Sequence, residues 1–421
     1  MPDRERQFIP ENTFDINVKI KELNYTNDLA NIRIISSILS PYQIVELNLL
    51  LDSNDIILEN LYGQDPIKVN VRIKGSGGDL LEQTDLDLMM LDSGYELTNK
   101  AQISDGKQED KQPFYIRTIC RQPFETMTTM VNEIYEEITI RDILKDLVQN
   151  KTGATLQFDS KGENTNTITQ AIIPPSTLYK IIKENSNEDD LEGFIDKQFG
   201  YFEGVPLVFC RYDNTVQIKN LSHKINSGGG IIVHHLASER DNKDIINESI
   251  NGSTFYTYSP ISINYSGNKK VARLANEVHY IVKPSDTLYE DISFNMVDIA
   301  RNYSLSPKEK KPEIIKSVSN RKKYNVGSCG DEENKTFAIS NLSRMLADLT
   351  AIEIGLEGVF QIKNIIEIGE PVKLKTQTVE YSELSGNYIL SSSIIDLNRG
   401  DENTGTQWNT VARLRLIRTE I

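Results

Sequence analysis

Cysteine, histidine and tryptophan are scarce in this 421-residue chain, which has three cysteines, four histidines and one tryptophan. Cys120, Cys210 and Cys329 lie far apart and form no C-x-x-C pair, so neither a zinc site nor dithiol redox exchange is indicated. No apolar run approaches the roughly 20 residues of a membrane-spanning helix. The charged start is not followed by an apolar run, so we expect no secretory signal.

Basic side chains are also in deficit, because 46 Lys and Arg stand against 61 Asp and Glu, for a formal net charge of -15. A surface that binds nucleic-acid phosphates needs the opposite balance, so we expect no specific nucleic-acid partner. The simplest interpretation of the acidity is solubility. Hydrophobic residues make up 38% of the chain. That content and this length predict roughly two to four folded domains.

Familiar catalytic motifs are missing. The chain has no G-x-x-x-x-G-K-[ST] loop, no G-x-G-x-x-G turn between strand and helix, no G-x-S-x-G elbow and no H-E-x-x-H pair. Ser76 stands in a Gly-rich link that is typical of a flexible turn. His234 and His235 are adjacent in a strand-like run, so we expect their side chains to point to opposite faces, where they cannot readily hold one metal ion.

Carboxylate pairs for sugar hydrolysis are defined by their separation in space, so sequence alone leaves them open. The pairs Asp189-Asp190 and Glu332-Glu333 stand in polar, loop-like contexts, and we interpret them as solvated charge. A basic run between residues 308 and 323 is interleaved with glutamate and is typical of a soluble loop. We therefore predict no catalytic, cofactor-binding or metal-binding residues, no cofactor and no enzymatic activity.

Alternation of apolar and polar residues, the period of a half-buried strand, dominates the first part of the chain. It predicts strands over residues 14–20, 44–51, 67–73, 86–91 and 114–119. From residue 123 the spacing turns helical. A helix is predicted over residues 139–148 with Thr139 as its N-cap, and a second from Pro175 towards Tyr201.

Strands dominate again in the last part of the chain. They are predicted over residues 206–209, 216–218, 231–233, 254–258, 261–265 and 277–282. Residues 303–336 hold few paired apolar positions and predict a long loop or insertion. A helix over residues 339–349 precedes a final β block over residues 351–418. The order of β, mixed α/β and β predicts an α+β fold that is mainly β.

A short repeat connects the two β regions. Residues 62–69, YGQDPIKV, and 368–374, IGEPVKL, both read as an apolar residue, Gly, a polar turn, Pro and an alternating strand. Gly and Pro are common at strand entries, so a chance match is the alternative to duplication.

The closing residues resemble a known family. Residues 368–374, 381–393, Trp408 and 413–419 look like the baseplate central hub proteins of contractile-tailed bacteriophages, the late-control-protein-D type, which are related to the N-terminal part of type VI secretion VgrG spikes. Residues 173–179, 199–201 and 208–213 are similar to that family's middle domain, and residues 61–63 to its first barrel. Residues 303–336 depart from the pattern.

The resemblance implies two similar, tube-like β-barrel domains that flank a mixed α/β middle domain. The corresponding ranges are 1–122 for the first barrel, 123–226 for the middle domain, 227–302 with 337–421 for the second barrel, and 303–336 for a loop-like insertion. It also implies a homotrimer with six barrels in a ring, which would match a hexameric tail tube on one side and a trimeric spike on the other.

Further partners and the location follow from the same resemblance. They would be the spike protein, the tail tube protein and other baseplate proteins, within a virion tail baseplate made in the bacterial host cytoplasm. DNA would pass transiently through the ring without specific binding, and acidic walls would repel its phosphates. The alternatives are a cell-wall hydrolase that uses carboxylates, or a carbohydrate-binding module of a tail. With 18 tyrosines but one tryptophan, aromatic stacking sites are possible without being signalled.

Overall fold

A computed structural model of the chain describes a subset of its residues, and every structural statement refers to that subset. The described residues are 13–38, 40–52, 65–74, 78–95, 111–183, 195, 199–202, 206–220, 230–236, 254–257, 261–263, 278–282, 291–295, 314–318, 351–357, 367–377, 384–399 and 408–417. Among the described helices, none is long and apolar enough to span a membrane.

Most described strands belong to one 14-stranded mixed sheet, called here the large sheet. Its first half holds β1 (Thr13–Ile20), β2 (Leu23–Asn24), β3 (Leu29–Ser37), β4 (Ile44–Asp52), β5 (Ile67–Lys74), β6 (Leu80–Tyr95) and β7 (Lys111–Cys120). Its second half holds β13 (Ile231–His235), β14 (Thr254–Thr257), β15 (Ser262–Ile263), β19 (Ile352–Glu357), β20 (Pro371–Thr376), β21 (Gly386–Arg399) and β22 (Trp408–Ile417).

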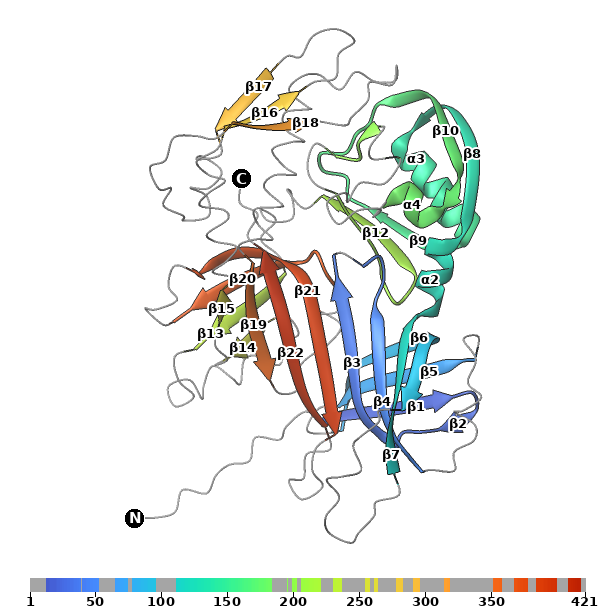
Figure 1. Ribbon diagram of the computed structural model, residues 1–421, viewed down its shortest axis with the longest axis vertical. Helices are drawn as coiled ribbons and strands as arrows, with labels where there is room; N and C mark the ends of the chain where they lie inside the picture. Colours follow the sequence, from blue (N-terminus) through green and yellow to red (C-terminus); the bar gives the residue numbers. More distant parts are fainter. Residues whose placement is uncertain are drawn as a thin grey trace.

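The halves join where β3 pairs antiparallel with β21, a contact called here the seam (Figure 1). It runs from Asn31 opposite Asn398 to Ser37 opposite Ser392. One main path through the sheet is therefore β14-β13-β20-β21-β3-β4-β7-β6-β5-β1-β2, and β22, β19 and β15 follow from the other edge of β21. One hydrophobic core includes side chains of both halves, among them Leu47 and Leu414.

Period-two patterning explains the predicted strands. Along β5 the apolar residues Ile67, Val69, Val71 and Ile73 are buried and the residues between them face outwards. Burial of each such side chain contributes about 1.5–3 kcal/mol relative to exposure. The strands predicted at 14–20, 44–51, 67–73 and 114–119 are confirmed, and the one predicted at 86–91 is the middle of the longer β6.

Two separate closed barrels are not seen among the described residues. The fold is mainly β, as predicted, but the strands expected to form two barrels join in one large sheet. The outer edge of β3 pairs with β21 of the other half instead of closing back onto strands of its own half.

Strand pairing in the first half recurs in the second. The order β5-β6-β7-β4-β3 and the order β20-β21-β22-β19-β15 are antiparallel at every step. The register of β6 on β7 shifts at Leu91, and that of β21 on β22 shifts at Ser391. The halves differ at the next strand, because β1 is antiparallel to β5 whereas β13 is parallel to β20.

A Glu–Arg cross-strand pair also recurs. Glu46 of β4 lies opposite Arg117 of β7, and Glu353 of β19 lies opposite Arg415 of β22. The bulge and the charged pair occupy matching register positions, so the recurrence extends beyond strand order.

A smaller group of elements, called here the α/β unit, lies between the halves in sequence and above the large sheet in Figure 1, and it has its own hydrophobic core. It holds α2 (Arg121–Thr128), β8 (Met130–Thr139), α3 (Ile140–Lys145), a π-helical turn (Asp146–Asn150), β9 (Thr155–Phe158), β10 (Thr167–Thr177), α4 (Leu178–Ile182), β11 (Pro206–Cys210) and β12 (Thr215–Asn220). β10 pairs with β8, while β11, β12 and β9 form a three-stranded sheet.

One helix prediction in the α/β unit is confirmed and another is wrong at its start. Thr139 caps α3, because its hydroxyl accepts a hydrogen bond from the Asp142 backbone N–H at 3.3 Å. Pro175, by contrast, belongs to β10, and α4 begins at Leu178. Proline lacks an N–H, and β10 tolerates it where its register on β8 shifts between Ile173 and Ser176. The strands predicted at 206–209 and 216–218 are confirmed.

A further sheet holds β16 (Val278–Val282), β17 (Asp291–Asn295) and β18 (Ile314–Val318), in the order β17-β16-β18. β18 corrects the prediction that residues 303–336 are loop-like throughout, because this short segment pairs parallel with β16. Few alternating positions are needed for so short a strand, so the sequence pattern missed it. The helix predicted over residues 339–349 lies outside the described residues.

Candidate functional site

The residues considered for catalysis or metal binding do not come together. His234 is half-buried and His235 is buried in β13, as expected for neighbours on opposite faces of a strand. Burial, together with the charge of Lys375, lowers the pKa of His234. Among the described residues, no group of three or more His, Cys, Asp or Glu side chains is placed to hold a metal ion. Ser76, Asp189-Asp190 and Glu332-Glu333 lie outside them.

Two of the cysteines are buried free thiols. Cys120 ends β7 and Cys210 ends β11. Burial raises the pKa of Cys120 to about 12 and also raises that of Cys210. A thiol with a raised pKa holds almost no thiolate at neutral pH, so neither is suited to nucleophilic chemistry.

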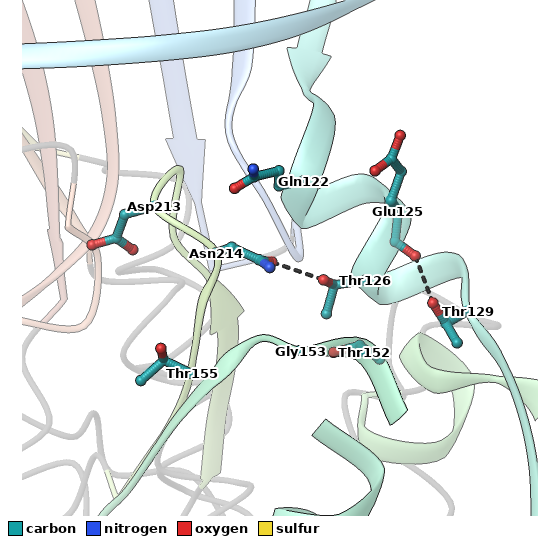
Figure 2. A pocket seen from close by; sticks show the side chains of 9 residues that line it. All are labelled: Gln122, Glu125, Thr126, Thr129, Thr152, Gly153, Thr155, Asp213 and Asn214. Atoms are coloured by element: carbon teal, nitrogen blue, oxygen red, sulfur yellow. Dashed lines mark hydrogen bonds between the residues drawn. The ribbon is translucent and has the colours of Figure 1, made fainter. Parts of the chain in front are cut away.

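A polar hollow of about 430 Å³ lies between α2, the end of the π-helical turn and the β11–β12 turn (Figure 2). Thr126 donates a hydrogen bond from its hydroxyl to the Asn214 side-chain oxygen at 2.7 Å. Glu125 and Asp213 line the hollow, and no Lys, Arg or His is among its lining residues. The Thr126–Asn214 hydrogen bond joins α2 to the β11–β12 turn, so the hollow lies where these parts of the α/β unit pack together.

A group of ion pairs lies where β12 meets the segment before β20, and it is called here the charged cluster. Arg211 contacts both carboxylate oxygens of Glu367 at 3.2 Å, and Lys219 lies 3.4 Å from that carboxylate. Each cation has a second carboxylate partner, Asp213 at 3.0 Å for Arg211 and Glu370 for Lys219. The cluster therefore ties the α/β unit to the second half of the large sheet.

Glu367 is the centre of the cluster. Its burial opposes ionisation, but a hydrogen bond from the Gln217 amide and the positive charges of Lys219 and Arg211 outweigh burial, so its pKa lies below the usual value. The Gln217 nitrogen lies 2.6 Å from the Glu367 carboxylate. Glu367 is thus held as an anion whose negative charge is matched by neighbouring cations.

A backbone turn accompanies the charged cluster. Gly369 has a φ of +76°, and a Cβ at this position would lie 2.2 Å from a methyl carbon of Leu207 in β11. Only glycine fits this close approach without displacing its neighbour. The Gly369 N–H also donates to the Leu390 carbonyl at 2.8 Å, which places the turn against β21.

A buried lysine ties the α/β unit to the first half of the sheet. The Lys183 ammonium donates to the Ile38 carbonyl at 2.5 Å and to the Val208 carbonyl at 3.0 Å. Ile38 in turn donates its N–H to the Ser391 carbonyl at 2.9 Å. Lys183 therefore holds the first half of the sheet at the Ile38 end of the seam, and the charged cluster holds the second half near the same end.

Side chains also cross the seam. Arg33 donates to the Asp396 carboxylate at 2.6 Å, and the Asn31 amide donates to Asn398 at 2.6 Å. The hydrogen bond to Asp396 contributes most to raising the pKa of Arg33. These contacts fix the register in which one half of the sheet meets the other.

Sequence reasoning missed this junction. In β12, alternation suggests that Gln217 and Lys219 face water, yet both are buried because their face of the strand is covered by Glu367. Glu367 lies about 150 residues away in sequence. In β12, only Val216 and Ile218 are apolar, so the local sequence carried no signal that Gln217 and Lys219 are buried.

No protein-family model matches the chain. No curated protein matches its sequence. Solved structures do match. The tail protein from Neisseria meningitidis MC58 has a TM-score of 0.57 at 10% identity, over 96% of this chain and 97% of that one. The 43 kDa tail protein of prophage MuSo2 from Shewanella oneidensis has a TM-score of 0.55 at 13% identity, over 96% and 98%.

The chain therefore has the fold of these two tail proteins over nearly its whole length, and the resemblance seen in the sequence is confirmed for the fold. A Francisella PdpA–VgrG complex is more distant, with a TM-score of 0.47 at 14% identity over 98% of this chain and 53% of that chain. A likeness at that level does not establish a shared fold.

Proposed function

We propose that the chain is a structural subunit of the central hub in the baseplate of a contractile phage tail or a related injection system. Three copies form a ring that connects a hexameric tail tube to a trimeric central spike. The observation that carries the proposal is the recurrent strand pairing of the two sheet halves, in a chain that shares its fold with two tail proteins along nearly its whole length.

Duplication gives the chain its proposed domains. Residues 1–122 form one barrel-like module, and residues 227–302 with 337–421 form a second. Residues 123–226 form the middle domain between them, and residues 303–336 are an insertion that includes β18. Two separate hydrophobic cores support a distinct middle domain, because Met127 through Ile218 pack in one while side chains from both halves of the large sheet share the other.

Symmetry gives the duplication its purpose. Three chains with two similar modules each present six similar units, arranged with pseudo-sixfold symmetry towards a hexameric tube. The same three chains remain threefold towards a trimeric spike. A single polypeptide can thereby join two assemblies of different symmetry without a separate adaptor.

The hub works by shape, and we assign no reaction to it. The fold that the chain shares with two tail proteins supports this assignment. The ring encloses part of the conduit for DNA, which passes without specific binding. The chain's net charge of -15 suits such a role, because an acidic wall repels phosphates. The protein is made in the host cytoplasm and ends in the virion baseplate, beside other baseplate proteins.

Native mass spectrometry of the purified chain, alone and with its tube and spike proteins, tests the proposal. We expect a species of three chains. Electron microscopy along its axis should show six similar lobes with true threefold symmetry. A chain that stays monomeric with both partners present would refute the hub assignment.

A further inference from the structure

We infer that the chain has an internal water site where β3, β4 and β21 meet, held by the side chains of Ser36, Gln43 and Ser393. The ligand is one or a few water molecules that bridge these three side chains. This site goes beyond the proposed hub role and does not depend on it.

Four buried polar atoms mark the site. Ser36 is 0%, Gln43 1% and Ser393 1% exposed. Within the described part of the chain, the two serine hydroxyls and both polar atoms of the Gln43 amide form no hydrogen bond. A buried polar group without a partner costs more than a typical hydrogen bond contributes, and folded proteins satisfy nearly all such groups. The four atoms therefore point to a polar ligand between them.

Strand register places the three side chains side by side. Ser36 of β3 lies opposite Ser393 of β21 across the seam (Figure 1). Gln43 comes directly before β4, and extending the β3–β4 register by one residue places it opposite Ser36. The Gln43 carbonyl accepts from the Cys120 N–H at 3.5 Å, which aligns it with the end of β7. Opposite residues have Cα atoms about 4.5–5.5 Å apart, a span that one water can bridge.

The apolar pattern of three strands stops at this level. Two residues further along the strands stand Ile34, Val45 and Ile395, all buried in the core of the large sheet. Side chains two residues apart in a strand share a face, so the three polar side chains point into the same interior. A single polar residue in a core could be incidental. Three on neighbouring strands at one level form a polar layer.

The polar layer lies between the two hydrophobic cores. Tyr42 packs against the core of the α/β unit, whereas Val45 belongs to the core of the large sheet. Gln43 stands between them in the chain. Lys183 of the α/β unit donates to the Ile38 carbonyl at this end of the seam. The water site is therefore part of the boundary along which the α/β unit meets the large sheet.

Small side chains leave room for the ligand. At the next level of the seam, Ile34 lies opposite Ile395, whereas here Ser36 lies opposite Ser393. Each isoleucine is larger than a serine by about two methyl groups, and a water takes about as much space as one methyl group. The serine pair therefore gives this level space for water.

Water also matches the donors and acceptors of the site. A serine hydroxyl both donates and accepts, and the Gln43 amide has N–H donors and an oxygen acceptor. Buried waters typically make about three hydrogen bonds to groups that lack other partners, and this site supplies three side chains. The nearby hydroxyls of Thr118 and Ser391 differ, because they donate to backbone carbonyls at 2.7 and 3.0 Å.

A crystal structure of the unmodified chain that resolves ordered water tests the site directly. We expect at least one water within hydrogen-bond distance of the Ser36 and Ser393 hydroxyls and of the Gln43 amide. A structure in which no water contacts these groups would overturn the inference.

The sign of an alanine substitution gives a second test. If water is bound, Ser36→Ala removes one of its partners and should raise the unfolding equilibrium constant in urea about fivefold, as for one lost neutral hydrogen bond. If the hydroxyl is dry, the same substitution removes a buried group without a partner and should lower that constant. Ser393→Ala should behave like Ser36→Ala. Because both serines hold the same water, the double variant should lose less than the two single effects multiplied.

Ser392→Ala is the matched control. Ser392 precedes Ser393 in β21, is half-buried on the opposite face and lies opposite Ser37. It tests the effect of replacing serine by alanine in the strand itself, and its unfolding constant should change at most about twofold.

A gain of stability in Ser36→Ala or Ser393→Ala would contradict the water site, because a hydroxyl bound to water loses a partner when it is removed. Should a variant fail to fold, the crystal structure of the unmodified chain decides alone. None of these results depends on whether three chains assemble, so failure of the water site and failure of the hub role are distinguishable.

Discussion

Replacing Glu367 by glutamine removes one negative charge from the charged cluster and keeps the shape of the side chain. Leaving a buried charge without its partner costs about 3–5 kcal/mol. Arg211 and Lys219 each keep a second carboxylate, Asp213 and Glu370. We therefore expect Glu367→Gln to lower the free energy of unfolding at pH 7 by about 2 kcal/mol, towards the value for a lost charged hydrogen bond.

Urea denaturation followed by the fluorescence of Trp408 measures this loss. Trp408 is the chain's single tryptophan and packs against the core of the large sheet, so its emission reports unfolding of that sheet. The matched control is Asp15→Asn, which breaks the ion pair with Lys74 at 2.9 Å between two exposed side chains. An exposed pair contributes at most about 1 kcal/mol, so the control should lose much less stability.

The pH dependence gives the stricter test. Because the pKa of Glu367 is lower in the folded chain than its ordinary value of 4.5, its ionised form stabilises the fold above that value. This stability is lost as the pH falls from 4.5 through the folded-state pKa. The difference between the unmodified chain and Glu367→Gln should therefore be constant from pH 8 to about 5.5 and shrink below 4.5.

Two results would refute this reasoning. In one, Glu367→Gln costs no more than Asp15→Asn at pH 7, which would mean that the cluster does not stabilise the junction. In the other, the stability difference stays unchanged down to pH 3.5, which would mean that ionisation of Glu367 is not coupled to folding.

Two further predictions concern the same junction and the buried thiols. Gly369→Ala should lower the free energy of unfolding, measured in urea, by about 2–4 kcal/mol, because alanine would be strained in this left-handed backbone conformation and its Cβ would clash with Leu207. Gly153→Ala is the control: its φ is +73° but the added Cβ meets open space, so it should cost about 1 kcal/mol. Equal losses in the two variants would contradict the packing argument. In a Cys329→Ser variant, Cys120 and Cys210 should stay unreactive towards a thiol reagent at pH 8 until urea unfolds the chain, because both are buried; rapid labelling of the native variant would contradict their burial.

Local patterns predicted the strands whose two faces differ. β1 and β5 alternate cleanly because one face packs in the core of the large sheet. β8 was missed because its apolar residues are not confined to a buried face, and Ile134 is 64% exposed. The start of α4 was placed too early because two prolines inside a strand look like the opening of a helix.

The junctions could not be predicted from local patterns. The seam joins Ser37 to Ser392, and the charged cluster joins Lys219 to Glu370, so each depends on residues far apart in the chain. The repeat at Pro66 and Pro371 did indicate two related sheets. It did not reveal that β3 continues into β21, because a strand's sequence specifies which face is buried and leaves its edge partner open.

The two ends of the seam differ in how they would respond to a pulling force. At the Ser37–Ser392 end, Lys183 holds Ile38 and the Gly369 turn holds Leu390, so several contacts must break together. At the other end, Asn31 and Asn398 are joined by an exposed side-chain hydrogen bond. Tension across the two halves should therefore break the β3–β21 hydrogen bonds one at a time from the Asn31 end. The contacts at Ile38 should be the last to break, so the seam should open in one direction only.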